Sequence, residues 1–277
     1  MNARAGAVRV EDLREQARQA RRLVIDAIHE RGTGHAGSSL SIIEVLTHLY
    51  FAHLDVDPAD PERADRDRLV FSKGHGSPAL YAVLALRGYF DRGLMRTLRS
   101  LGSGLQGHPH AGMLPGVDQS TGSLGQGISC ALGMALGLRM RASKARVFCI
   151  LGDGEMQEGQ NWEAFMAAAH YGVGNLVAIL DWNKLQSDGR LDEIMSLGDI
   201  AAKLRAFGWT VSTIDGHDFV DIARGLAEAA GDVPHFIVAD TVKGRGVSFM
   251  EDVMHWHHHP ISDDEFAQAM GELETGL

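Results

Sequence analysis

The chain alternates amphipathic and fully apolar segments along most of its length. Residues 11–30 place apolar side chains three and four positions apart, which predicts an amphipathic helix. Residues 147–151 and 176–180 are short runs of consecutive apolar residues, which predicts strands buried on both faces. Strands of this kind alternating with helices indicate an α/β fold, with a parallel sheet covered by helices on both faces.

The same pattern predicts the other elements. Further helices are expected at 41–51, 77–87, 124–140, 160–171, 200–207 and 219–230, and further strands at 69–71, 210–214 and 236–239. Ser41 is the expected N-cap of the helix at 41–51, where Glu44 would complete a capping box. Parallel sheets bind ligands beyond the carboxyl ends of their strands, so the residues that follow each strand are the first candidates for a site.

Composition excludes several classes of protein. The 277 residues are 45% hydrophobic and 22% charged, enough apolar surface for one core. The formal net charge of −10 argues against a nucleic-acid or membrane partner, because both select a basic face. The two cysteines, Cys130 and Cys149, lie in apolar runs. A disulfide scaffold is therefore excluded, no signal peptide or membrane span is evident, and we expect a cytoplasmic protein.

Two of the predicted strands are followed by oxygen-bearing side chains. Asp153 lies between two glycines after the strand at 147–151, and Asn183 follows the strand at 176–180, thirty residues later. A right-handed crossover of that length brings neighbouring strand ends side by side. Carboxylate and amide oxygens suit Mg²⁺, and the glycines let a phosphate approach the backbone. Gly-Asp-Gly alone is more typical of a simple turn, but the paired Asn183 favours a metal site.

This spacing resembles the thiamine diphosphate signature, in which an asparagine follows Gly-Asp-Gly by about thirty residues. Other segments resemble the diphosphate-binding region of transketolases, in the same order, over about residues 11–259. They are Gly34-His35-Ala36-Gly37, Ser72-Lys73-Gly74-His75-Gly76-Ser77, Gly107-His108-Pro109, Pro115-Gly116-Val117, Thr121-Gly122-Ser123-Leu124-Gly125-Gln126-Gly127, Asp215-Gly216-His217-Asp218 and Lys243-Gly244-Arg245-Gly246. One such segment is weak evidence, whereas seven in register are specific.

The resemblance implies a role for each matching residue. Asp153 and Asn183 would hold Mg²⁺ (or Ca²⁺ or Mn²⁺) through their side chains, and Leu185 through its carbonyl. The implied cofactor contacts are His75 and Gly154 at the diphosphate, Asn183 through the metal, Gly122 and Leu124 along the aminopyrimidine and thiazolium, and Glu158 in a carboxylate network across an interface between subunits. The implied ligands of the donor sugar are His35, His108 and His257.

Histidine suits this chemistry because its unperturbed pKa lies near neutrality and its ring can donate to a developing alkoxide. The last of the three sugar ligands comes from a tract that holds His255, His257, His258 and His259. We choose His257 on its spacing from Lys243-Gly244. Such a tract is also typical of a solvated loop or an incidental metal binder.

The matching motifs end with the diphosphate-binding half of a transketolase. The resemblance implies a second domain that grips the aminopyrimidine, activates the cofactor and binds the sugar phosphate. We therefore expect residues 1–277 to be a single diphosphate-binding domain, without pyrimidine-binding and C-terminal domains. The predicted function is that of the amino-terminal subunit of a split transketolase, which transfers a two-carbon ketol unit from a ketose (phosphate) to an aldose (phosphate). A separate C-terminal subunit would complete an α2β2 heterotetramer.

Other interpretations stay open at this point. The alpha subunit of a 2-oxo acid dehydrogenase, or a deoxyxylulose phosphate synthase fragment, shares the metal signature but resembles the other segments less well. A non-catalytic cofactor-binding module is a different class of protein. A nicotinamide oxidoreductase is excluded, because no Gly-x-Gly-x-x-Gly with a following acidic residue opens a first strand–helix unit. The sugars are not specified, and pentose phosphate metabolism is the default.

Overall fold

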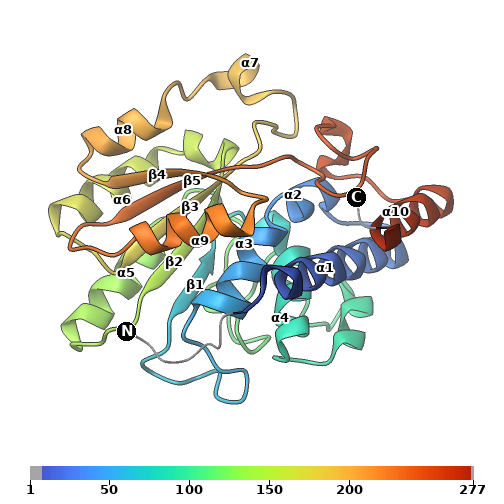
Figure 1. Ribbon diagram of the computed structural model, residues 1–277, viewed down its shortest axis with the longest axis horizontal. Helices are drawn as coiled ribbons and strands as arrows, with labels where there is room; N and C mark the ends of the chain where they lie inside the picture. Colours follow the sequence, from blue (N-terminus) through green and yellow to red (C-terminus); the bar gives the residue numbers. More distant parts are fainter. Residues whose placement is uncertain (1–7, 276–277) are drawn as a thin grey trace.

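A computed structural model describes residues 8–275, which are built around one sheet of five parallel strands (Figure 1). The strands are β1 (Arg68–Phe71), β2 (Val147–Gly152), β3 (Leu176–Trp182), β4 (Thr210–Asp215) and β5 (His235–Asp240). Their order across the sheet is β1-β2-β3-β5-β4, and every neighbouring pair is parallel. The predicted α/β fold is confirmed.

Helices surround this sheet. They are α1 (Val10–Arg31), α2 (Ala36–Leu40), α3 (Ile43–His48), α4 (Ser77–Arg87), α5 (Gly127–Met140), α6 (Gly159–His170), α7 (Leu191–Met195), α8 (Ile200–Ala206), α9 (Phe219–Glu228) and α10 (Asp263–Thr275). In Figure 1, α10 lies beside α1, and Arg18 of α1 donates to the Leu273 carbonyl of α10. Within residues 8–275, no helix has the length and apolar character needed to cross a membrane.

Successive residues of the central strands enter two different cores, because side chains alternate across a sheet. Phe148 and Ile150 of β2 pack with α1, α3, α4 and α9, whereas Val147, Cys149 and Leu151 pack with α5, α6 and α8. All six residues of β2 are buried. The apolar run in the sequence therefore reflects a strand that is covered on both faces, as expected.

The predicted helix at 41–51 is wrong in its start and its cap. The chain forms α2, then α3, and then a short π-helix at Leu49–His53. The Ser41 hydroxyl donates to Asp181 at 2.6 Å and does not cap α3, and the Glu44 carboxylate pairs with Arg21. Tertiary partners therefore replace the local capping box.

Candidate active site

The carboxyl ends of β2 and β3 bring the three predicted metal ligands to one edge of the sheet. Gly152 is in register with Asp181, so Asp153 and Asn183 lie just beyond paired strand ends. The Asp153 carboxylate accepts hydrogen bonds from the backbone N–H of Gly154, at 2.7 Å, and of Lys184. Asp153 therefore touches the loop that carries Asn183 and Leu185.

Asp153 carries a charge that its surroundings do not fully compensate. It is 4% exposed, and burial together with the nearby charge of Asp181 raises its pKa to about 6. A divalent cation at this point would offset both effects. The oxygens of Asp153, Asn183 and Leu185 are the hard donors that such a cation prefers, so the residues fit the metal that the resemblance implies.

Asp181 lies beneath these ligands and organises them. Its buried carboxylate accepts hydrogen bonds from Lys73, Ser41, Thr241 and the Asn183 amide nitrogen, the last at 3.3 Å. Burial would raise the pKa of Asp181, but the charge and hydrogen bond of Lys73 hold it below its ordinary value. Because the Asn183 nitrogen faces Asp181, its oxygen is left for the backbone N–H of Leu185, at 3.2 Å, and for a metal.

Lys243 places a buried ammonium group at the same edge. Its Nζ donates to the Leu185 carbonyl at 2.7 Å and to His257 Nδ1 at 2.9 Å, and the residue is 1% exposed. Burial lowers the pKa of Lys243 to about 8. The sequence alone does not assign Lys73 or Lys243 to the site, although both lie within matching segments, because burial of a lysine cannot be read from the chain.

Gly154 lies close to a buried side-chain donor that has no partner in the described part of the chain. A Cβ atom added at Gly154 would lie 3.2 Å from the side chain of Gln186. The Gln186 Nε2 atom is buried and has no hydrogen-bond partner within residues 8–275. A buried donor left unpaired beside a partly buried glycine suits a phosphate oxygen. Gln186 was not predicted as a site residue.

Three of the predicted histidines gather next to this edge. The ring centroids of His35, His75 and His257 lie 5.3–5.5 Å from one another. The ring centroid of His258 also lies 4.6 Å from that of His35, whereas His255 and His259 contact each other in a tilted arrangement, with their ring centroids 3.7 Å apart. Within the tract, His257 and His258 therefore face the cluster.

Burial changes the chemistry that these rings can perform. Burial, with the positive charges nearby, lowers the pKa of His35 and of His257 to about 3, and that of His75 well below its ordinary value. The rings are therefore neutral at pH 7, which differs from the titration near neutrality expected from their type. Because the Lys243 ammonium donates to Nδ1 of His257, that ring carries its proton on Nε2.

His108 and Gly122 form the outer part of the site. A Cβ atom added at Gly122 would lie 3.0 Å from the His108 ring, so the glycine allows close packing. Burial lowers the pKa of the partly exposed His108. Leu124 is 36% exposed and Glu158 is also exposed, so these two predicted residues remain open to a partner surface.

Glu155 was not predicted, but it joins three of the matching segments. Its buried carboxylate accepts from the Ser72 hydroxyl and from the backbone N–H groups of Gly125, at 2.9 Å, and Gly152, at 3.0 Å. Three donors satisfy a carboxylate that burial would otherwise make costly. Glu155 thereby fixes the loops around Asp153.

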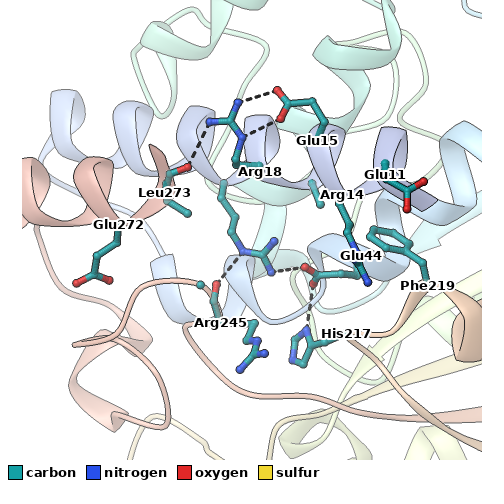
Figure 2. A pocket seen from close by; sticks show the side chains of 13 residues that line it. Glu11, Arg14, Glu15, Arg18, Glu44, His217, Phe219, Arg245, Glu272 and Leu273 are labelled. Atoms are coloured by element: carbon teal, nitrogen blue, oxygen red, sulfur yellow. Dashed lines mark hydrogen bonds and ion pairs between the residues drawn. The ribbon is translucent and has the colours of Figure 1, made fainter. Parts of the chain in front are cut away.

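A separate cavity of about 570 Å³ lies beside α1 (Figure 2). Arg14 and Arg18 lie at this cavity, together with Glu44 and His217. None of the predicted site residues lines it. The cavity is therefore distinct from the edge that holds Asp153.

Comparison with known proteins identifies the family. The family model described as transketolase, thiamine diphosphate binding domain, matches residues 13–275. The chain is 45% identical over 265 residues to the 6-deoxy-6-sulfo-D-fructose transketolase subunit SqwG of Clostridium sp. (strain MSTE9), covering 95% of this chain and 96% of that relative. It is 38% identical to a protein of Phocaeicola vulgatus named as a subunit of apulose-4-phosphate transketolase, covering 98% and 96%.

Solved structures and longer relatives match in the same way. The transketolase of Campylobacter jejuni superposes with a TM-score of 0.91 at 30% identity, covering 96% of this chain and 43% of that one. Human transketolase is 38% identical over 272 residues, with the match covering 43% of its length. The chain therefore spans about two-fifths of these longer proteins, but nearly all of the relatives named as subunits.

Proposed function

This chain belongs to the transketolase family through its thiamine diphosphate-binding domain, and on that premise we propose that it is the amino-terminal subunit of a two-subunit transketolase. One observation carries the proposal: the chain covers 96% of two relatives named as transketolase subunits. The comparisons favour this function over a 2-oxo acid dehydrogenase subunit or a non-catalytic module.

We assign the metal to the edge of β2 and β3. Asp153 and Asn183 would bind Mg²⁺ through side-chain oxygens, and Leu185 through its carbonyl. The raised pKa of Asp153 supports this assignment, since a cation would stabilise its ionised form. Asp181 would act indirectly, by turning the Asn183 oxygen toward the metal.

The diphosphate would lie against Gly154 and His75, with the Lys243 ammonium and the Gln186 amide as additional donors. When bound, thiamine diphosphate supplies the electron sink for cleavage of a carbon–carbon bond in the ketose. Lys243 favours an anion here because it is buried and, within residues 8–275, its Nζ hydrogen-bonds to two neutral groups, the Leu185 carbonyl and the His257 ring.

The neutral histidines would hold the donor sugar. His257 presents an Nε2–H group, which can donate to a hydroxyl or carbonyl oxygen of the sugar. His35 and His108 would each offer one donor and one acceptor. The free ring nitrogen of His35 can accept a hydrogen bond from a sugar hydroxyl at pH 7, because the low pKa of the ring keeps that nitrogen unprotonated.

The remaining parts of the active site would come from a second subunit. Gly122 and Leu124 would face the rings of the cofactor, and Glu158 would meet a carboxylate of the neighbouring subunit. The exposure of Leu124 and Glu158 supports this arrangement. The proposed assembly is an α2β2 heterotetramer in the cytoplasm.

The substrates would be a ketose and an aldose that carry an anionic end group. One relative is named for 6-deoxy-6-sulfo-D-fructose and another for apulose 4-phosphate, so both a sulfonate and a phosphate are candidate end groups. Xylulose 5-phosphate and 6-deoxy-6-sulfo-D-fructose should therefore both be tested as donors.

The deciding experiment measures ketol transfer with Mg²⁺ and thiamine diphosphate. The chain is assayed alone, and then with the product of the adjacent gene, against both donors and ribose 5-phosphate. Activity only in the mixture supports the proposal and identifies the partner. Full activity of the chain alone overturns the split active site, and absence of thiamine diphosphate binding in the mixture overturns the cofactor assignment.

A further inference from the structure

The segment from Val242 to Gly246 positions Lys243 in the site. Its backbone is held by hydrogen bonds to two side chains that lie outside the site. The backbone N–H of Val242 donates to His217 Nε2 at 2.9 Å. The carbonyl of Arg245 accepts from Arg21 Nε at 2.8 Å. One anchor thus stands immediately before Lys243 and the other two residues after it.

A single carboxylate holds both anchors. Glu44 pairs with Arg21 Nη2 at 2.6 Å through Oε1 and with His217 Nδ1 at 3.0 Å through Oε2. The dashed lines at Glu44 in Figure 2 mark these contacts, and all three side chains line the cavity. We name Arg21, Glu44 and His217 the Glu44 clasp; it joins α1, α3 and the loop after β4.

The donor and the acceptor of each hydrogen bond at His217 are fixed, and the side chains of the clasp are nearly buried. Because a backbone N–H can only donate, His217 Nε2 must accept, and the ring proton therefore lies on Nδ1 and points to Glu44. The three side chains are 8–11% exposed. Burial alone would raise the pKa of Glu44, but the charge of Arg21 and the hydrogen bond from His217 bring it below its ordinary value.

Glycine at position 246 allows Arg21 to reach its anchor. Gly246 has φ +90°, and a Cβ atom there would lie 2.7 Å from Arg21 Nε. A side chain at this position would displace the guanidinium. Gly244 likewise has φ +79°, and its N–H donates to the Gly37 carbonyl at 3.0 Å. The positive φ angles of these two glycines therefore allow the backbone to contact both the clasp and the loop at Gly37.

We propose that the Glu44 clasp positions Lys243, so that its ammonium bridges the metal-binding loop at Leu185 and the sugar-binding ring of His257. The proposal rests on the function proposed above for Leu185 and His257. His217 is then a positioning residue, which touches neither cofactor nor sugar. Its Asp215-Gly216-His217-Asp218 segment acts on the site indirectly, by holding the backbone next to Lys243. Loosening the clasp should weaken cofactor binding more than it lowers the rate at saturation.

The first test measures amide hydrogen exchange in the full chain without cofactor. In His217→Leu, the Val242 amide should exchange at least about tenfold faster, because its acceptor is lost. His217→Gln retains an acceptor near the position of Nε2 and should restore most of the protection. Unchanged exchange at Val242 in His217→Leu overturns the clasp.

The second test measures cofactor saturation in the complex with the partner subunit. His217→Leu and Gly246→Ala should each raise the half-saturating thiamine diphosphate concentration about tenfold while changing the saturated rate less than about twofold. His235→Leu is the matched control. His235 is also a buried, hydrogen-bonded histidine, but its partners are Thr210 and Ser212. It should lower the unfolding temperature without shifting saturation.

A double variant separates the clasp from two independent effects. Glu44→Gln combined with His217→Leu should weaken cofactor binding less than the sum of the two changes, because both break one unit. Strict additivity overturns the clasp. If the wild-type complex shows neither cofactor saturation nor ketol transfer, the proposed function fails, while hydrogen exchange at Val242 still decides whether the clasp holds its segment.

Discussion

At the amino ends of the strands, the buried Arg66 forms an ion pair with Asp118, whereas at the carboxyl ends the buried Asp153 and Lys243 have hydrogen-bond partners but no ion pair within residues 8–275. Arg66 donates to Asp118 and to the carbonyls of Pro61 and Asp67, and the second Asp118 oxygen accepts from the Leu69 N–H. Hydrogen bonds and the charge of Asp118 raise the pKa of Arg66 despite its burial.

At the carboxyl ends the balance is the opposite. Burial raises the pKa of Asp153 to about 6 and lowers that of Lys243 to about 8, so each charged form is disfavoured. Gln186 nearby leaves a buried donor unpaired among the residues described. A buried charged group with a structural role therefore has an ion partner within the chain, whereas the buried charged groups assigned to ligand binding do not. Four changes test this contrast, in order of decreasing effect.

Asp118→Ala should produce the largest loss of stability. It leaves Arg66 buried without its ion partner, so the free energy of unfolding should fall by about 3–5 kcal/mol in urea titrations. Glu274→Ala, which removes the exposed partner of Arg22, should cost less than about 1 kcal/mol. A similar small loss in both variants would refute the structural role of the amino-end pair.

Asp153→Ala should leave the fold intact and weaken metal-dependent binding of thiamine diphosphate by more than about a hundredfold. Burial disfavours the ionised form of this carboxylate, so its removal should lower the free energy of unfolding only slightly. Titration of the cofactor at fixed Mg²⁺ measures the effect, and Asp188→Ala, an exposed aspartate of the next loop, is the control. Unchanged affinity would remove Asp153 from the metal site.

His108→Ala should lower turnover about tenfold or more and change the affinity for thiamine diphosphate by less than about threefold. The ring lies against Gly122 at the open side of the site, so its removal should not disturb the diphosphate edge. His110→Ala, which removes an exposed ring from the same loop, should leave both quantities unchanged. Wild-type turnover in His108→Ala would exclude a sugar contact.

Lowering the pH from 7 to about 6 should produce the smallest effect, because it only enters the range in which two buried histidines destabilise the fold. Burial lowers the pKa of His48 and of His53 to about 4, below the value of about 6.5 in an unfolded chain. The stability they allow is complete above pH 6.5 and is lost as the pH falls toward 4, because the unfolded chain binds the protons first. His48→Leu should make the free energy of unfolding less dependent on pH in this range; an unaltered dependence would contradict the assignment.

The fold could be predicted because its information is local. Apolar runs define β2 and β3, and the three–four spacing defines α1 to within one residue at each end. The helices α2, α7 and α10 were not predicted. The first two have only five residues each, whereas α10 carries Phe266, Ala269, Met270 and Leu273 at three–four spacing, so its signal was present in the sequence. The error at Ser41 has a different cause: its hydroxyl is used by Asp181, a residue far along the chain.

The candidate site could be predicted only where a motif marks a residue. Asp153, Asn183 and His75 stand in such motifs and lie at one edge of the sheet. Gln186 lies in no such motif. The burial of Lys243 depends on how the segment that follows β5 packs in the folded chain, which the local sequence does not indicate. His217 lies in a matching segment, but its partner Glu44 is distant in sequence, and the local pattern around Glu44 indicates a helix cap instead.

The order of the strands has a consequence for synthesis of the chain. β3 pairs with β2 on one side and with β5 on the other, but β5 begins at His235, more than fifty residues after the end of β3. Until the ribosome has released β5, one long and almost wholly buried strand has an unpaired edge. Nascent chains should therefore be most prone to aggregation, and most dependent on chaperones, while those intervening residues are being made.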